Sequence, residues 1–190
     1  MIYMKIIGIS TSPRENSNSR IALEKALETV KSKGFTVELF DLNLLNIQTC
    51  QADDYCLEHE GCCVLDDDMQ AIYGALRDCH GVILATPIYM GNVSSNAKIF
   101  IDRLYAVLQA VDSYNVAGKK FSVIASQAAV DPPMYEYIKH NLETTVDIFR
   151  GIGFDVEDVV LLIGNDTAGA IVDKEDQLNK AVMVGNKIVR

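Results

Sequence analysis

The sequence contains no tryptophan, only three histidines and four prolines, and no long hydrophobic run. Its longest unbroken apolar segment, Val159 to Ile163, is far shorter than the ~20 residues that a membrane-spanning helix requires. Basic residues are also scarce, because 17 Lys and Arg stand against 26 Asp and Glu and leave a net charge of −9. An acidic average surface repels polyanions, so we expect neither a membrane nor a nucleic-acid partner.

The remaining composition is that of an ordinary globular protein. Of the 190 residues, 49% are hydrophobic and 23% are charged, which suits one domain, 1–190, with a substantial core. The start, Met1 to Ile9, has the pattern of a strand and leaves no room for a secretion signal. Five cysteines are an odd number, which fits a reducing compartment. We therefore expect a cytoplasmic protein.

Short β-rich apolar runs alternate with longer segments whose apolar residues recur at helical spacing. This alternation predicts an α/β fold, a three-layer sandwich with a five-stranded parallel sheet of order 2-1-3-4-5. The expected strands are Tyr3–Ile9, Thr36–Asp41, Gly81–Thr86, Lys120–Ser126 and Phe154–Ile163, with Pro87 ending the third. The expected helices cover about 17–33, a segment capped by Asp66 to Asp68, about 94–110 with Leu108 facing the sheet, a segment after Pro133, and a segment from about Asp173.

In open sheets of this order, ligands bind outside the carboxyl ends of strands one and three. The loop after the first strand, Ser10 to Ser19, is dense in hydroxyl and amide groups. Together with the N-terminus of the next helix, such a loop can hold a phosphate dianion. The alternative is that these residues only cap the helix. The candidate phosphate-binding residues are Ser10, Ser12, Pro13, Arg14, Ser17, Asn18 and Ser19.

Two loops resemble those of one known family. The segment from Ser10 to Ser19 is similar to a Ser-x-Ser-Pro-Arg-x-x-Ser-x-Thr loop, with Thr11 where Gly is common and Ser19 where Thr is common. The segment from Thr86 to Ser94 is similar to a Ser/Thr-Pro-x-Tyr-x-Gly-x-x-Ser loop, and Lys98 and 100–103 match as well. The chain thus resembles the NADPH-dependent FMN reductases and iron-sulfur flavoproteins of the flavodoxin-like superfamily.

The resemblance implies that FMN is the cofactor and that the second loop cradles its ring. Tyr89 and Met90 would supply an aromatic and apolar wall, and turn amides near Gly91 would face the pyrimidine edge. The alternative is a tight turn with a surface tyrosine. The residues implied to contact the flavin are Pro87, Ile88, Tyr89, Met90, Gly91, Asn92, Val93 and, after the fourth strand, Ser126 and Gln127.

Four cysteines, Cys50, Cys56, Cys62 and Cys63, crowd the loop after the second strand. Iron-sulfur flavoproteins carry there a Cys-x2-Cys-x2-Cys-x5-Cys set for a [4Fe–4S] cluster. In the same register this chain has Cys50, Asp53, Cys56 and Cys62, with Cys63 as a substitute ligand. Clusters are usually held by four thiolates. Three interpretations therefore stay open, namely a cluster, a zinc ion, or free cysteines without metal.

By this resemblance the chain is an FMN-dependent oxidoreductase that passes electrons from NADPH or NADH to a flavin, a quinone or a redox-protein acceptor. The cofactor carries such chemistry, so no catalytic acid or base residue is expected. The competing interpretation is an iron-sulfur flavoprotein or flavodoxin-like electron carrier without NAD(P)H activity. A flavin-binding redox sensor is a third alternative. The resemblance also implies a homodimer or homotetramer.

Overall fold

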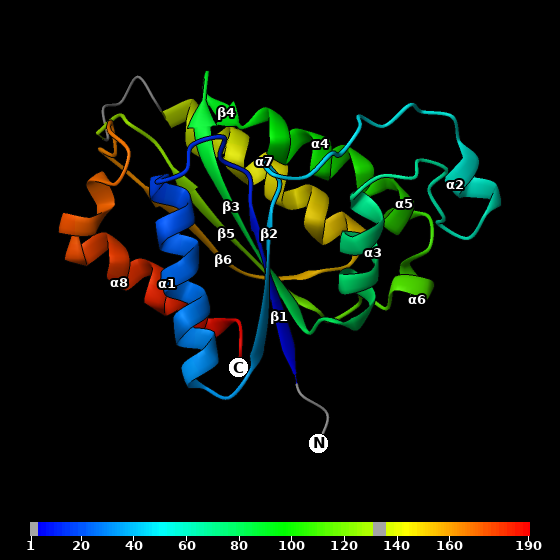
Figure 1. Cartoon of the computed structure of the whole chain (residues 1–190), viewed down its shortest axis with the longest axis horizontal. Coiled ribbons are helices and arrows are strands. Elements are labelled where there is room, and N and C mark those ends of the chain that lie inside the picture. Colours follow the sequence, from blue (N-terminus) through cyan, green and yellow to red (C-terminus); the bar gives the residue numbers. More distant parts are fainter. Residues whose placement is uncertain (1–3, 131–135) are drawn as a thin grey trace.

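A computed structural model describes residues 4–130 and 136–190 and shows an α/β sandwich (Figure 1). Five parallel strands form the sheet in the order β2-β1-β3-β5-β6, and a short β4 pairs antiparallel with β3. This is the predicted order 2-1-3-4-5, counted over the parallel strands. The parallel strands are β1 (Lys5–Ser10), β2 (Thr36–Asp41), β3 (Gly81–Tyr89), β5 (Lys120–Ser126) and β6 (Asp155–Leu162), and β4 is Asn92–Val93.

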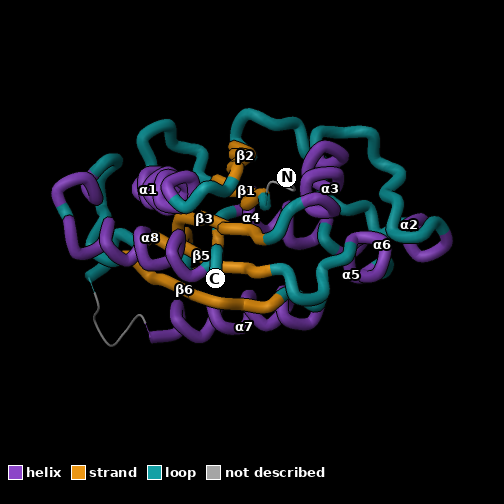
Figure 2. The backbone as a smooth tube through the Cα atoms, turned by 90° about the horizontal axis from the view of Figure 1, so that it is seen from below, coloured by secondary structure: helices purple, strands orange, loops and turns teal. Residues whose placement is uncertain are grey.

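Helices cover both faces of the sheet (Figure 2). On one face α1 and α8 bury an aliphatic cluster against β1, β3 and β5, and on the other α3 to α7 bury a larger one that includes Phe100, Phe121 and Phe149. The helices are α1 (Asn18–Ser32), α2 (Tyr55–Glu58), α3 (Met69–Asp78), α4 (Ser95–Arg103), α5 (Tyr105–Leu108), α6 (Val111–Tyr114), α7 (Glu136–Ile152), the 3-10 helix η2 (Ala170–Asp173) and α8 (Glu175–Lys187). Among the described residues no helix is long and apolar enough to cross a bilayer.

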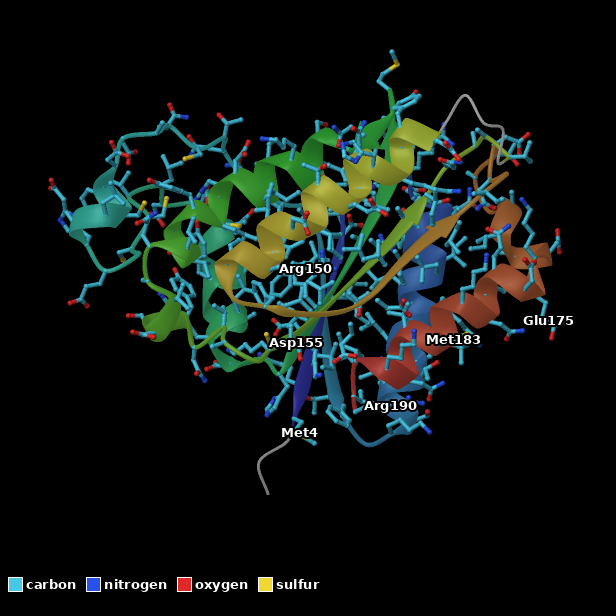
Figure 3. The ribbon with its side chains drawn as sticks, turned by 180° about the vertical axis from the view of Figure 1, so that it is seen from behind. Met4, Arg150, Asp155, Glu175, Met183 and Arg190 are labelled. Carbon is cyan, nitrogen blue, oxygen red and sulfur yellow. The ribbon has the colours of Figure 1, made fainter. Side chains whose placement is uncertain are left out.

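One short turn and one close contact between helices fix how the elements pack. The turn after α7 is short, so Arg150 near its end and Asp155 at the start of β6 lie close together in Figure 3. Helix α8 runs from Glu175 past Met183 beside α1. Its Cα carbon at Gly185 approaches α1 so closely that an added Cβ would lie 2.5 Å from the Ala26 carbonyl oxygen. This contact fixes the position of α1, whose N-terminus belongs to the candidate site.

Two element predictions were wrong, and a third is confirmed in part. Pro87 does not end the third strand, because β3 continues to Tyr89 with Pro87 opposite Ser126 of β5. On its other side β1 has ended at the Ser10–Ala85 pair, so a residue without an N–H is tolerated there. The single helix 94–110 is broken at Leu104 into α4 and α5, and the Leu108 side chain is 41% exposed. At the start of α3 the Asp68 side chain makes no capping hydrogen bond, but Asp67 Oδ1 accepts from the Met69 N–H at 3.0 Å, so the predicted carboxylate cap comes from Asp67.

Candidate functional site

A cavity of about 220 Å³ lies at the carboxyl ends of β1, β3 and β5, where the strand order predicts a ligand. The start of α1 opens into it, and the last residues of β3 form another wall. Its lining residues are Ser12, Arg14, Ser17, Asn18, Ser19, Pro87, Ile88, Tyr89, Ser126, Ala128, Asn165 and Asp166. The structure therefore brings together most of the phosphate loop, three residues of the flavin loop and the end of β5.

Helix α1 begins at the edge of this cavity, with Ser17, Asn18 and Ser19 in its lining. Ser17 is the N-cap, with extended backbone, and its Oγ accepts a hydrogen bond from the Arg20 N–H at 3.1 Å. The first turn of α1 carries no acidic residue, so the positive end of the helix dipole is not neutralised there. Arg14 is exposed and is the one basic side chain among the described lining residues. This arrangement suits a small anion.

The predicted donors of the phosphate loop do not all serve the cavity. Ser12 Oγ accepts a hydrogen bond from the Arg14 N–H at 3.2 Å, which shapes the turn. The Asn18 amide donates to the Asn165 and Thr167 carbonyl oxygens and accepts from the Ile171 N–H. Its side chain therefore ties α1 to the segment after β6, and only its backbone N–H is left for an anion.

Two predicted residues are buried beside the cavity without lining it. Ser10 Oγ and Gln127 Oε1 are buried and have no hydrogen-bond partner among the described residues. Pro13 is exposed and is likewise absent from the described lining.

Sequence reasoning missed Asn165 and Asp166, which follow β6. The available signal was the general one that every loop at the carboxyl edge of such a sheet is a candidate.

The flavin loop is a β-hairpin whose tip projects from the sheet. Met90 and Gly91 have positive φ angles of 49° and 79°. A Cβ on Gly91 would lie 2.4 Å from Cε2 of Tyr137, and Asn141 Nδ2 donates to the Gly91 carbonyl oxygen at 2.9 Å. Helix α7 thus holds the tip. Only a glycine satisfies both the backbone angle and the space at this position.

The structure divides the residues predicted for the flavin. Pro87, Ile88 and Tyr89 line the cavity. Met90 is fully exposed, and Asn92 and Val93 line a second hollow between the hairpin, α4 and α7. The hairpin therefore presents Tyr89 to the cavity and directs its tip elsewhere.

A buried hydroxyl cluster joins the phosphate loop to the flavin loop. Thr11 Oγ1 donates to the Ala85 carbonyl oxygen at 3.0 Å, and Ser94 Oγ donates to the Thr11 carbonyl oxygen at 2.9 Å. Thr86 Oγ1 accepts from the Ser94 N–H at 3.1 Å. Ser94 is also the N-cap of α4 and accepts from the Ala97 N–H. The cluster fixes the two loops relative to each other.

We expect Thr11→Val to lower the free energy of unfolding by about 1–3 kcal/mol, the cost of leaving buried polar groups without partners. Valine has the shape of threonine but cannot donate to Ala85, which lies buried with Thr11. Urea unfolding measures the loss. Thr11→Ser keeps the hydroxyl and should recover most of it, whereas equal losses in both variants would show that the methyl group, not the hydrogen bond, matters.

The cysteine loop, residues 42–68, extends away from the sheet toward α5 and α6 (Figure 1). Arg103 of α4 is fully buried beneath it and holds both of its ends. The guanidinium donates to the Gln48 carbonyl oxygen at 2.9 Å and to both Asp67 carboxylate oxygens, at 2.5 and 3.1 Å. Burial lowers and the Asp67 hydrogen bond raises the pKa of Arg103, and the net shift is upward. Arg103 therefore stays charged.

Three cysteines line one cavity beside this arginine. Cys50, Cys56 and Cys63 line a cavity of about 20 Å³ together with Asp53 and Arg103. Burial raises the pKa of the Cys56 thiol, and the neighbouring Cys63, Cys50 and Asp53 add to that rise. Cys62 is exposed and is not among the described residues that line this cavity. Cys63, rather than Cys62, thus takes the fourth position of the predicted set.

This arrangement does not fit a four-iron cluster. Such clusters are usually held by four thiolates, and the cavity offers three thiols and a carboxylate in room for about one water molecule. Within residues 4–130 and 136–190, no three His, Cys, Asp or Glu side chains are close enough to hold a metal ion. Cys79, predicted to be core, is buried, at the end of α3.

Comparison with known proteins decides the family. Residues 4–131 match the model of NADPH-dependent FMN reductases. The chain belongs to this family. An iron-sulfur flavoprotein of Archaeoglobus fulgidus is 31% identical to this family member over 189 residues, which covers 97% of this chain and 79% of that protein. The match confirms the resemblance seen in the two loops.

Other relatives match this family member over a shorter stretch. A second iron-sulfur flavoprotein of Archaeoglobus fulgidus is 39% identical over 105 residues, 55% of this chain and 53% of that protein, and the chain spans about half the length of several such curated relatives. The solved NAD(P)H:quinone oxidoreductase from Methanothermobacter marburgensis superposes with a TM-score of 0.74 at 18% identity, over 99% of this chain and 98% of that one. This likeness concerns the fold, which is flavodoxin-like.

Proposed function

We propose that the chain is an FMN-dependent NAD(P)H oxidoreductase whose cofactor occupies the cavity between α1 and β3. One observation carries the proposal, namely that the N-terminus of α1, Arg14 and the serines of one loop open into the same cavity as Tyr89. The phosphate of FMN requires hydrogen-bond donors and positive charge, and its flat ring requires an apolar or aromatic wall, so FMN needs both environments in one site. When bound, FMN supplies the hydride and electron chemistry.

The protein's own residues bind and orient the cofactor in this proposal. Backbone N–H groups at the start of α1 and the hydroxyls of Ser12, Ser17 and Ser19 would hold the phosphate, and Arg14 would balance its charge. Pro87, Ile88 and Tyr89 would exclude water from one face of the ring. Ser10 Oγ and Gln127 Oε1 are buried without a partner among the described residues, and in this proposal Ser10, Gln127 and Ser126 contact or position the flavin.

We expect Arg14→Gln to weaken FMN binding about tenfold, the effect of one charge at a partly exposed site. Riboflavin, which lacks the phosphate, should bind equally well to both proteins. Isothermal titration of the flavin-free chain measures both affinities. Lys33→Gln is the matched control, because Lys33 is exposed at the opposite end of α1. Equal weakening of FMN by both variants, or equal loss of riboflavin, would contradict a phosphate contact.

Turnover separates the reductase from a competing function. The iron-sulfur flavoprotein relatives favour an electron carrier without nicotinamide activity as the second candidate. The FMN-loaded chain should oxidise NADPH or NADH over many turnovers with a soluble quinone or free flavin as acceptor. A chain that retains FMN but never exceeds one turnover would support the carrier instead.

We further propose that the chain works as a homodimer or homotetramer with a small-molecule or redox-protein acceptor. Light scattering of the FMN-loaded chain measures the assembly, and a monomer would contradict the homodimer or homotetramer.

The same proposal places the chain in the cytoplasm. All five cysteines are free, which supports a reducing, cytoplasmic setting.

A further inference from the structure

The cavity beneath the cysteine loop gathers reactive groups that the proposed flavin chemistry does not use. Cys50, Cys56 and Cys63 line it with Asp53 and Arg103. Its volume of about 20 Å³ leaves room for about one water-sized group between these side chains. The thiols therefore lie around one small space, open enough for a small reagent to approach through the exposed residues 50–54.

Cys63 is distinguished from its neighbour Cys62 by a cation. Nη2 of Arg103 donates a hydrogen bond to Sγ of Cys63 at 3.5 Å, and a guanidinium beside a sulfur stabilises negative charge on it. Arg103 Nε is buried and has no partner among the described residues. Arg103, which lines the same cavity as Cys63, therefore retains an unused donor.

A turn brings Cys56 back toward Cys63. The Gly61 N–H donates to the Cys56 carbonyl oxygen at 3.0 Å, and the Cys62 N–H donates to the His59 carbonyl oxygen at 2.9 Å. Cys56 and Cys63 are both half-buried and pack against the same hydrophobic cluster. Cys62, between the turn and Cys63, is exposed. The turn thus places Cys56 and Cys63 in the lining of one cavity and leaves Cys62 outside it.

We propose that Cys56 and Cys63 form a redox-active dithiol whose substrates are low-molecular-weight disulfides. The Cys63 sulfur attacks one sulfur of the disulfide RSSR, so that a mixed disulfide forms and one RS⁻ leaves. The Cys56 sulfur then attacks the Cys63 sulfur, the mixed bond breaks, and the second RS⁻ leaves. The two thiol protons end on two RSH molecules, and two electrons pass from the protein to RSSR.

The test uses oxidised glutathione as the disulfide, with the full chain in its FMN-loaded and flavin-free forms. Mass spectrometry should show the loss of two hydrogens, and peptide mapping should place the bond between Cys56 and Cys63. Cys56→Ser should stop at a glutathione adduct on Cys63. Cys63→Ser should slow the reaction at least ~10-fold, because it removes the sulfur beside Arg103.

Cys62→Ser is the matched control and should react within about twofold of the wild-type rate, because its thiol lies outside the cavity. A disulfide mapped to Cys50 or Cys62, or a Cys62→Ser variant as slow as Cys63→Ser, would overturn the proposal. Iron and sulfide bound in stoichiometric amount to the purified chain, and lost in Cys50→Ser, would also overturn it. The result is independent of FMN, since a chain that fails to bind flavin still reports the thiol reaction.

Discussion

Asp67→Asn is expected to lower the free energy of unfolding by about 3–5 kcal/mol, because it leaves a buried charge without its partner. The side chains of Asp67 and Arg103 are both fully buried, with Nη1 and Oδ2 2.5 Å apart. A neutral amide cannot balance the guanidinium, whose side chain is fully buried beneath the cysteine loop. Urea unfolding at neutral pH, followed by circular dichroism, measures the loss.

The same helix provides the control. Lys98 and Asp102 form an ion pair on the surface of α4, with side chains 62% and 46% exposed. Asp102→Asn should cost no more than about 0.5 kcal/mol, as exposed pairs contribute little. A loss in Asp67→Asn as small as that in Asp102→Asn would show that water reaches Arg103.

Lowering the pH of the unmodified chain should reveal how much the Asp67–Arg103 ion pair contributes to stability. Burial pushes the pKa of Asp67 up, but the hydrogen bonds from Arg103 and from the Gln48 and Met69 N–H groups prevail and hold it below its usual range. The folded-state pKa is thus below that of the unfolded chain, so the stabilisation is present above pH ~4 and is lost as the pH falls further. The Asp67→Asn variant should show a shallower decline over that range.

Gly185→Ala is expected to destabilise the fold by about 2–3 kcal/mol, the cost of overpacking a tight contact. The added Cβ would lie 2.5 Å from the Ala26 carbonyl oxygen and 2.8 Å from the Thr29 Cβ. Backbone cannot move aside as a flexible side chain can, so α8 must shift away from α1. Thermal and urea unfolding measure the loss, and we expect weaker FMN retention because α1 forms the phosphate site.

Gly74→Ala separates this contact from helix propensity. Gly74 also lies within a helix, α3, but a Cβ there would meet nothing within 4 Å. Alanine should therefore stabilise the chain by about 0.5–1 kcal/mol. If both alanine variants gain stability, the approach of α8 to α1 is looser than the structure indicates.

The periodic parts of the fold were predictable from sequence. Two strands, Thr36–Asp41 and Lys120–Ser126, have the predicted bounds, because apolar runs between turn residues mark buried parallel strands. The break at Leu104 and the exposed Leu108 were not predictable, since helical spacing continues through both positions. Only tertiary packing around Ala106 and Val107, both buried, decides where the helix bends.

Proline at position 87 misled the interpretation for a related reason. The rule that proline ends a strand assumes a hydrogen-bonded neighbour on each side. Here β1 stops first, which no local pattern reveals. Asn18 is similar: its residue type predicted a donor to an anion, but its partners, Asn165, Thr167 and Ile171, come from the far end of the chain.

The charged and thiol side chains were the hardest to place. Arg103 entered the sequence interpretation only as part of a matched motif, because a single arginine carries no signal of burial. Its partner Asp67 was interpreted as a helix cap, and it does accept from the Met69 N–H, but no local pattern revealed its ion pair with Arg103. The spacing of the cysteines along the sequence favoured Cys62 as the last residue of the set. In the structure Cys63, the next residue, lines the cavity instead.

Both stems of the cysteine loop, at Gln48 and Asp67, are fastened to one guanidinium on α4. The segment between them has no strand pairing, but side chains of two other helices also hold it: Tyr114 donates to the Gly61 carbonyl oxygen at 3.2 Å, and Gln70 donates to the Cys63 and Leu65 carbonyl oxygens at 3.2 and 2.7 Å. A change of length or of ligand residues within this segment would leave the strand pairing of the sheet intact. A loop grafted between positions 49 and 66 must, however, restore the carbonyl acceptors for Tyr114 and Gln70 if it is to lie against α3 and α6 as the present one does.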